Sequence, residues 1–172
     1  IDDVLRAFQH FEPVSAFRTK FDYDNLLYLV AGELTARVSG QSWGSFVQKE
    51  ILSPLKMNHA YTSVQDASLK ETIARPHAFD GQSLKVIQTD LSTKGRSKLN
   101  SAAGGIWASA NDLCKWMLVQ LNEGKHGTDL SQTLLSAEQH HEMWRLHTPI
   151  NQRQDPRSPF KVNFSGYGLG WF

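Results

Sequence analysis

The sequence predicts an α+β fold of the mainly helical kind, with few strands. Apolar residues recur at helical spacing in five segments, an Asp-Gly pair at 80–81 marks one hairpin turn, and strand character rises only at the C-terminal GYGLGWF. With 172 residues, 40% of them hydrophobic and 20% charged, the chain fits one domain with a sizeable core.

The first two expected helices span residues 2–11 and 24–39. The first ends before Pro13, which cannot continue a helix. The second is apolar almost all round at residues 26–31, which predicts a buried helix. Gly40 follows its last turn, where glycine supplies the left-handed residue that closes a helix.

The third expected helix starts at Ser42 and stops at Pro54. Residues 60–100 are polar and irregular, so we expect loops and one hairpin there, with strand-like SLKVIQT after the Asp-Gly turn.

The last two expected helices each begin with a capping serine. Ser109 precedes an acid three residues later, close to a capping box, and this helix runs to Gly124. Ser136 opens the other helix, which runs to about Leu146.

Composition narrows the function classes. Eighteen basic and seventeen acidic residues give a net charge of +1 without a basic stripe, so nucleic acid is not an indicated partner. No run approaches about 18 apolar residues, so no membrane span is expected. Cys114 is the one cysteine, which excludes an internal disulfide framework, and its place on an amphipathic helix predicts a small core residue.

Three short motifs match, loosely, the elements of serine acyl-transfer enzymes: Ser-x-x-Lys, Ser/Tyr-x-Asn and Lys-Thr-Gly. A serine hydroxyl needs a neighbouring base to take its proton, and a lysine one helical turn away can serve or tune that base. The matches are Ser53-Pro54-Leu55-Lys56, Tyr23-Asp24-Asn25 and Lys125-His126-Gly127.

The context fits only the second match. Ser53 ends a helix and Pro54 follows it, whereas such a nucleophile needs the first turn of a helix. Lys125 lies in NEGKHGTD, which predicts a polar loop rather than a substrate-orienting strand. Tyr23 and Asn25 lie where a loop enters the second helix. From the residues alone, they are either half of an active site or a packing ring and a helix cap.

The surrounding sequence resembles the serine β-lactamase-related family, which includes class C β-lactamases, penicillin-binding esterases and D-amino-acid peptidases. The resemblance rests on Tyr-x-Asn before a helix, Ser-Gly-Gln-Ser, a Pro-Leu-x-Met turn and Ala-Gly-Gly before a capped helix, in this order over about residues 15–147. It implies an α/β (α+β) serine β-lactamase-like fold, of which this chain forms mainly the helix-rich lobe.

The resemblance implies a role for each residue of the second motif. Tyr23 would be the catalytic phenol in the proton path between serine, lysine and leaving group, and a phenol ionises at neutral pH only near cations such as that lysine. Asn25 would bind the amide carbonyl of the substrate. The nucleophile is expected upstream of Ile1 and the third element after Phe172.

The resemblance also assigns structural parts. Ser53 falls in the Pro-Leu-x-Met turn rather than in the nucleophile element. Gly104 and Gly105 allow a tight backbone turn before the fourth helix. Because the chain starts at Ile1 rather than Met and ends as a strand begins, we expect residues 1–172 to be a single partial domain, an internal fragment of a longer protein.

We therefore expect the parent protein to be a serine hydrolase that forms an acyl-enzyme with a small-molecule or peptide-like amide or ester, without a cofactor or a metal ion. The chain alone is expected to be inactive and to self-associate through exposed apolar surface. The family favours a periplasmic or extracellular location. The alternative is a non-catalytic binding or assembly module of the same fold, in which Tyr23 and Asn25 are structural.

Three histidines near the end of the chain could indicate a metal site: His140, His141 and His147. The zinc-protease spelling would need a histidine where Arg145 stands, and no third ligand accompanies His140 and His147. The sequence therefore favours a solvated helix face over a metal site.

Overall fold

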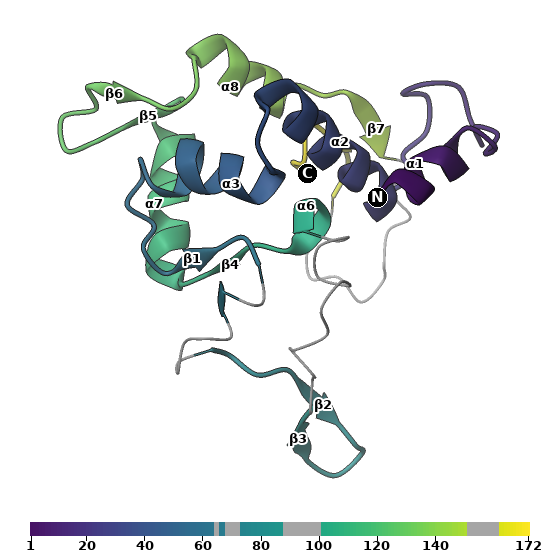
Figure 1. The fold of residues 1–172 in the computed structure, drawn as a ribbon, viewed down its shortest axis with the longest axis horizontal. Helices are drawn as coiled ribbons and strands as arrows, with labels where there is room; N and C mark the ends of the chain where they lie inside the picture. Colours follow the sequence, from purple (N-terminus) through teal and green to yellow (C-terminus); the bar gives the residue numbers. More distant parts are fainter. Residues whose placement is uncertain (64–65, 68–72, 88–100, 151–161) are drawn as a thin grey trace. The chain divides into compact units, whose positions relative to one another are not determined.

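The computed structural model describes residues 1–172 apart from 64–65, 68–72, 88–100 and 151–161 (Figure 1). The described residues form two compact units. Unit 1 consists of Ile1 and Asn25–Lys115, and unit 2 consists of Asp2–Asp24 and Trp116–Phe172. The boundary falls inside helix α7 (Ala110–Leu121), which contributes to both units.

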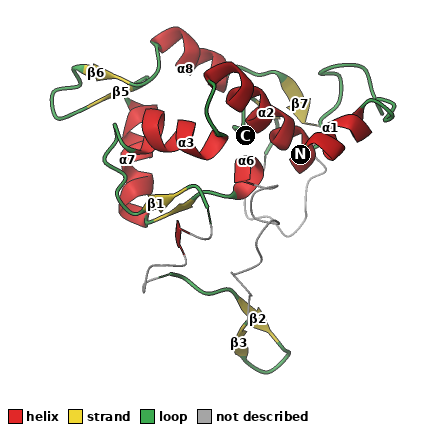
Figure 2. Ribbon diagram, viewed as in Figure 1, coloured by secondary structure: helices red, strands yellow, loops and turns green. Residues whose placement is uncertain are grey.

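Helices form the centre of unit 1 (Figure 2). Helix α2 (Asn25–Ser39) packs against α3 (Trp43–Val47) and the short α6 (Ser101–Gly104). Gly32 allows α6 to approach, since a Cβ at this position would lie 2.5 Å from the Cβ of Ala102. The buried apolar side chains of unit 1 are Leu29, Val47, Leu52, Leu55, Met57, Ala60 and Ala67.

Helix α2 has the expected span but not the expected burial. Gly40 closes it with a φ of +69°, as predicted. Leu29 and Gly32 are its buried residues, whereas Val38 is 80% exposed. The prediction of a buried helix was wrong, because residues 26–31 are apolar almost all round while the described part of unit 1 covers one face, which leaves Leu26 and Leu27 exposed.

The third expected helix changes its hydrogen-bond pattern midway. It begins after Ser42, whose hydroxyl accepts a hydrogen bond from the N–H of Ser45 at 3.2 Å. Residues Gln48–Leu52 then form a π-helix, η1, in which the Ser53 N–H donates to the carbonyl five residues earlier at 2.9 Å. A π turn holds one residue more than an α turn. The helix ends before Pro54, as predicted.

Short antiparallel strand pairs complete unit 1. Strand β1 (Ala60–Tyr61) pairs with β4 (Trp107–Ala108), and β2 (His77–Phe79) pairs with β3 (Leu84–Val86). The second pair confirms the hairpin predicted at Asp80-Gly81, where Gly81 has a φ of +97°. The last two residues of SLKVIQT lie outside the described residues.

Unit 2 begins with helix α1 (Asp2–Phe8), which is shorter than the predicted 2–11. After Phe8 the chain continues in turns, in which the His10 N–H donates to the Ala7 carbonyl (3.0 Å) and the Phe11 N–H donates to that of Phe8 (3.1 Å). These bonds span three residues rather than four, so the α-helical geometry ends earlier than the apolar spacing indicates.

The C-terminal part of unit 2 follows the second half of α7. A hairpin of β5 (Lys125–His126) and β6 (Gln132–Thr133) comes first, so the prediction of a loop at Lys125 was wrong. Two paired residues on each side suffice for a short hairpin, without the apolar alternation of a half-buried strand.

Helix α8 (Ala137–Trp144) follows, capped as predicted by the Ser136 hydroxyl, which accepts from the Gln139 N–H at 3.2 Å. It ends two residues before the predicted Leu146, because Arg145 adopts an extended conformation. Strand β7 (Thr148–Ile150) then pairs with β8 (Ser165–Tyr167). The sequence predicts strand character in GYGLGWF, but the strand includes only Gly166 and Tyr167 of that segment.

Both units combine helices with strands of two or three residues, which confirms the helix-rich α+β class. No helix in the described part of the chain is both long enough and apolar enough to cross a bilayer.

Candidate active site

Tyr23 lies in unit 2, in the loop before α2, and is 51% exposed. Its ring centroid lies 6.4 Å from that of Phe21 and 6.5 Å from that of Tyr167, and the Tyr167 ring is nearly perpendicular to it, at 88°. Edge-to-face pairs at this separation are attractive, because the positive edge of one ring meets the negative face of the other. The Tyr23 phenol is therefore half in solvent and half in contact with other rings.

These rings belong to an aromatic cluster made of Phe21, Tyr23, Tyr167 and Phe172. Phe21 lies 5.3 Å from Tyr167 and 6.0 Å from Phe172, and Tyr167 lies 4.9 Å from Phe172. The cluster joins the N-terminal segment of unit 2 to strand β8 and the C-terminal residue. The sequence does not reveal this cluster, since contacts between residues more than 140 positions apart leave no local pattern.

Asn25 is the first residue of α2 in unit 1, and it is exposed. This is the position that both interpretations of the motif predict. An exposed carboxamide in the first turn can hydrogen-bond a ligand from solvent, and it can also accept a hydrogen bond from a backbone N–H group of that turn.

Ser53 and Lys56 do not share a helix face. Ser53 follows η1, and its hydroxyl accepts a hydrogen bond from the Gln48 side chain at 3.3 Å. Lys56 has a φ of +54°, and its N–H donates to the Ser53 carbonyl at 3.0 Å in a tight turn. A lysine that tunes a serine needs helical spacing, so this geometry does not form a Ser-x-x-Lys nucleophile.

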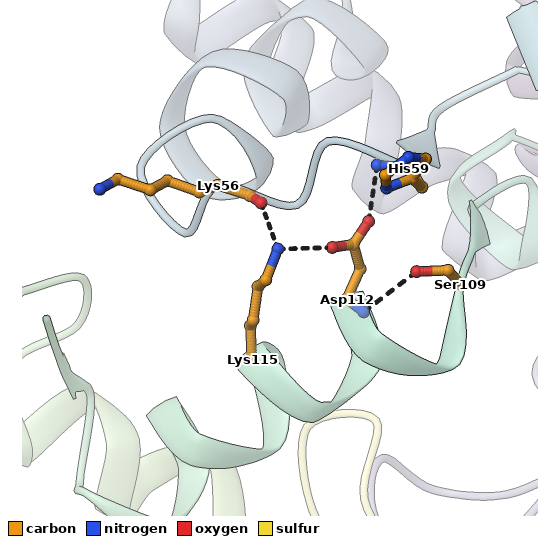
Figure 3. A network of polar contacts seen from close by, with 5 residues as sticks. All are labelled: Lys56, His59, Ser109, Asp112 and Lys115. Atoms are coloured by element: carbon orange, nitrogen blue, oxygen red, sulfur yellow. Dashed lines mark hydrogen bonds and ion pairs between the residues drawn. The ribbon is translucent and has the colours of Figure 1, made fainter. Parts of the chain in front are cut away.

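A polar clamp holds this turn to α7 (Figure 3). Lys115 donates to the carbonyl oxygen of Lys56 and, at 2.7 Å, to the carboxylate of Asp112. The other Asp112 oxygen accepts the His59 backbone N–H at 2.6 Å. The N–H of Asp112 donates to the Ser109 hydroxyl at 3.2 Å, the cap that the sequence predicts. We define the polar clamp as Asp112, Lys115, Lys56 and His59.

Asp112 is buried, with 1% of its surface exposed. Burial raises the pKa of its carboxyl, but the hydrogen bonds from Lys115 and from the His59 N–H oppose this, and the pKa ends below its ordinary value. Asp112 therefore stays ionised at neutral pH inside unit 1. Its partners satisfy both oxygens, so the clamp has a structural role rather than a catalytic one. The sequence indicates Asp112 only as part of a helix cap.

Gly105 has the backbone role that the sequence predicts for the Gly-Gly pair. A Cβ at Gly105 would lie 2.5 Å from the Cα of Ser101, whereas a Cβ at Gly104 would meet nothing within 4 Å. The close approach is thus specific to the second glycine.

The histidines differ from the predicted solvated face. His141 is exposed, but the His147 side chain is 6% exposed and its Nε2 lies 3.1 Å from the Glu142 carbonyl oxygen. The Nε2 of His140 is buried beside Trp144. Both rings thus lie against residues of α8, His147 beside Glu142 and His140 beside Trp144. Within the described ranges, no three His, Cys, Asp or Glu side chains gather as a metal site.

Cys114 is exposed, so the prediction of a core residue was wrong. The helical stripe that contains it also contains Leu113 and Met117, which are exposed in the structure as well. Within the residues of α7 that belong to unit 1, the buried side chain is that of Asp112. It precedes Leu113 in the sequence and does not belong to the apolar stripe.

A cavity of about 590 Å³ lies in unit 1 between α2, α3 and α6. Apolar and polar side chains share its wall, including Leu29, Trp43, Ser45 and Asp66. Its lining does not include Asn25.

The sequence model of the Beta-lactamase family matches residues 2–172. Among curated proteins, an unguisins hydrolase of Aspergillus violaceofuscus is 31% identical over 71% of this chain and 22% of its own length. A beta-lactamase of Escherichia coli is 26% identical over 67% of this chain and 28% of its own length. The chain thus spans less than a third of either relative.

Two solved structures share the fold. An octameric penicillin-binding protein homologue from Pyrococcus abyssi superposes with a TM-score of 0.65 at 23% identity, over 91% of this chain and 31% of its own. A penicillin-binding protein from Bacillus halodurans has a TM-score of 0.63 at 19% identity, over 98% of this chain and 45% of its own. At this level of identity, the likeness concerns the fold alone.

Proposed function

The chain belongs to the Beta-lactamase family, and on that premise we propose that it forms part of a serine hydrolase that acts on an amide or ester through an acyl-enzyme. The observation that carries the proposal is the family match over residues 2–172 together with an exposed Tyr23 and Asn25 at the start of α2. Relatives with hydrolase names support the reaction class.

The proposed reaction has two stages. A serine oxygen attacks the substrate carbonyl and the leaving group departs with a proton, which forms the acyl-enzyme. Water then attacks the ester and releases the acid. Tyr23 is proposed to carry the proton between the serine, a lysine and the leaving group. Asn25 is proposed to hydrogen-bond the substrate amide, because its side chain both donates and accepts.

The nucleophile is proposed to lie outside these 172 residues. Ser53, the loose match within the chain, lies in a turn fixed by the polar clamp and has Lys56 at a left-handed position. The short share of each relative that the chain spans supports a longer parent protein. The chain on its own is then proposed to be inactive.

The test is intact-mass analysis after incubation with a fluorophosphonate, with the full-length protein and the 172-residue chain side by side. One adduct on the full-length protein and none on the chain is the expected result. An adduct mapped to Ser53 would contradict the assignment of the turn. If neither forms an adduct, the proposal fails in favour of a non-catalytic binding or assembly module of the same fold.

The role of Tyr23 is tested in the same assay. Replacing Tyr23 with Phe keeps the ring and removes the hydroxyl, so the rate of adduct formation in the full-length protein should fall roughly a hundredfold, within the range of general acid–base contributions. An unchanged rate would remove Tyr23 from the mechanism without affecting the proposed nucleophile.

A further inference from the structure

At the end of strand β8 a tyrosine lies between two glycines, Gly166-Tyr167-Gly168, and both glycines lie close to neighbouring residues. A Cβ at Gly166 would collide with the side chain of Leu146. A Cβ at Gly168 would collide with the carbonyl oxygen of Met143. Gly168 can therefore carry no side chain while the strand lies against the end of α8, whereas a side chain at Gly166 would displace only the flexible end of Leu146.

The alternation of a strand sends Tyr167 to the opposite face. There its ring meets Phe21 at 5.3 Å and Tyr23 at 6.5 Å, in edge-to-face geometry. The glycines thus lie on one face of the strand and the Tyr167 ring lies on the other, beside Tyr23. Moving the strand away from α8 would break its contact with that helix.

The backbone around Tyr167 is held on both sides. Tyr167 pairs with Thr148 in β7, and its carbonyl accepts the His147 N–H at 2.9 Å. The N–H of Gly168 donates to the Trp171 carbonyl at 2.8 Å, and that of Leu169 donates to the Met143 carbonyl at 2.9 Å. A ring mounted on this backbone is a fixed surface against which an exposed phenol can be oriented.

We propose that Tyr167 is a positioning residue for Tyr23. The inference rests on the proposed function, in which the Tyr23 hydroxyl carries a proton. Tyr23 is 51% exposed and lies in a loop, so the neighbouring rings of the aromatic cluster contribute to its orientation. The Tyr167 edge favours the rotamer in which the two rings are perpendicular. It acts through its ring, and its own hydroxyl has no part in the reaction.

The test uses the full-length protein and the rate of hydrolysis of p-nitrophenyl butyrate. Tyr167→Leu removes the ring, and kcat should fall by about tenfold to a hundredfold with little change in KM, as expected when a reacting group is misplaced. Tyr167→Phe keeps the ring and should restore most of the rate. A loss in Tyr167→Phe equal to that in Tyr167→Leu would overturn a role for the ring.

A double-mutant cycle separates positioning from general packing. In a Tyr23→Phe background the hydroxyl is already absent, so Tyr167→Leu should lower kcat by less than about twofold more. An undiminished loss in that background would show that Tyr167 does not act through Tyr23. Full activity of Tyr23→Phe alone would instead count against the proposed function, so the two failures are distinguishable.

Phe21→Leu provides a second variant if Tyr167→Leu does not fold. It removes the other ring that contacts both Tyr167 and Tyr23, so it should give the same loss of kcat and the same dependence on the Tyr23 hydroxyl. A Phe21→Leu protein with the parent kcat would contradict orientation by the aromatic cluster.

Discussion

Lys115 lies one helical turn after Asp112 and donates to its buried carboxylate at 2.7 Å. The same ammonium donates to the carbonyl oxygen of Lys56, 59 residues earlier in the chain. One cation therefore neutralises a buried charge and fixes a distant turn in unit 1. Removing one of the two charges leaves the other without its ion-pair partner, which makes the pair sensitive to substitution.

Asp112→Asn in the full-length protein should lower the free energy of unfolding by about 1–3 kcal/mol, because the buried amide can accept only one of the two hydrogen bonds that the carboxylate accepts from Lys115 and from the His59 N–H. Urea denaturation followed by circular dichroism measures it. The matched control is Glu50→Gln, which breaks the exposed pair with Lys49 and should cost less than about 1 kcal/mol. Equal effects of the two substitutions would contradict the special role of the buried pair.

The stability contributed by Asp112 should depend on pH. Its pKa is lower in the folded state, so the unfolded state binds more protons between the two values and stability rises with pH there. The contribution is complete above the ordinary pKa of 3.8 and disappears as pH falls through the lowered value. The difference in melting temperature between the parent and Asp112→Asn should therefore shrink below about pH 4.

The melting temperature of the parent must be compared with that of Asp112→Asn, since Asp80 also titrates at low pH and contributes to the pH dependence of both proteins. Its pKa is lowered to about 2, with the hydrogen bond from Lys85 as the largest cause. A difference in melting temperature that stays constant from about pH 6 down to about pH 2 would contradict the assignment to Asp112.

The two glycines before β4 should respond oppositely to alanine. Gly105→Ala places a Cβ 2.5 Å from the Cα of Ser101 and should cost about 1–3 kcal/mol of unfolding free energy. Gly104→Ala meets open space and should be neutral or stabilise by up to about 1 kcal/mol, through a less flexible unfolded chain. Thermal unfolding of both variants measures the contrast, and similar melting temperatures would argue against the close approach at Gly105.

Asn25→Asp should separate the two interpretations of Asn25. No acidic residue lies in the first turn of α2, and a carboxylate there is favourable near the N-terminus of a helix, so stability should stay within about 1 kcal/mol of the parent. A carboxylate cannot donate a hydrogen bond, so adduct formation with a fluorophosphonate or ester hydrolysis should slow about tenfold or more. Unchanged activity would favour a purely structural Asn25.

Local signals in the sequence predicted the starts of three helices, whereas α1, α7 and α8 end earlier than their apolar spacing indicates. Ser42, Ser109 and Ser136 cap helices as their spacing indicates, and Asp80-Gly81 forms the predicted turn. Each of these features depends on hydrogen bonds within a few residues, so a short stretch of sequence contains the whole cause.

Features that depend on distant residues could not be predicted in this way. The burial of Asp112 depends on the His59 N–H, and the exposure of α2 depends on which elements cover it. In the aromatic cluster Phe21 contacts Tyr167, and no local sequence pattern predicts this contact. For the same reason, Tyr23 and Asn25 were selected by resemblance to a family and not by spacing alone, and their roles stay predictions.

The π turn in η1 fixes the number of residues between α3 and the polar clamp. Its extra residue rotates everything after it by about 100° relative to an uninterrupted α-helix. Lys56 and His59 reach Lys115 and Asp112 in that rotated register. A one-residue insertion within 48–53 would therefore turn both backbone groups away from α7, whereas the exposed β2–β3 hairpin imposes no such count on its turn. In a library of one-residue insertions, tolerance should be lowest in the first segment and highest in the second.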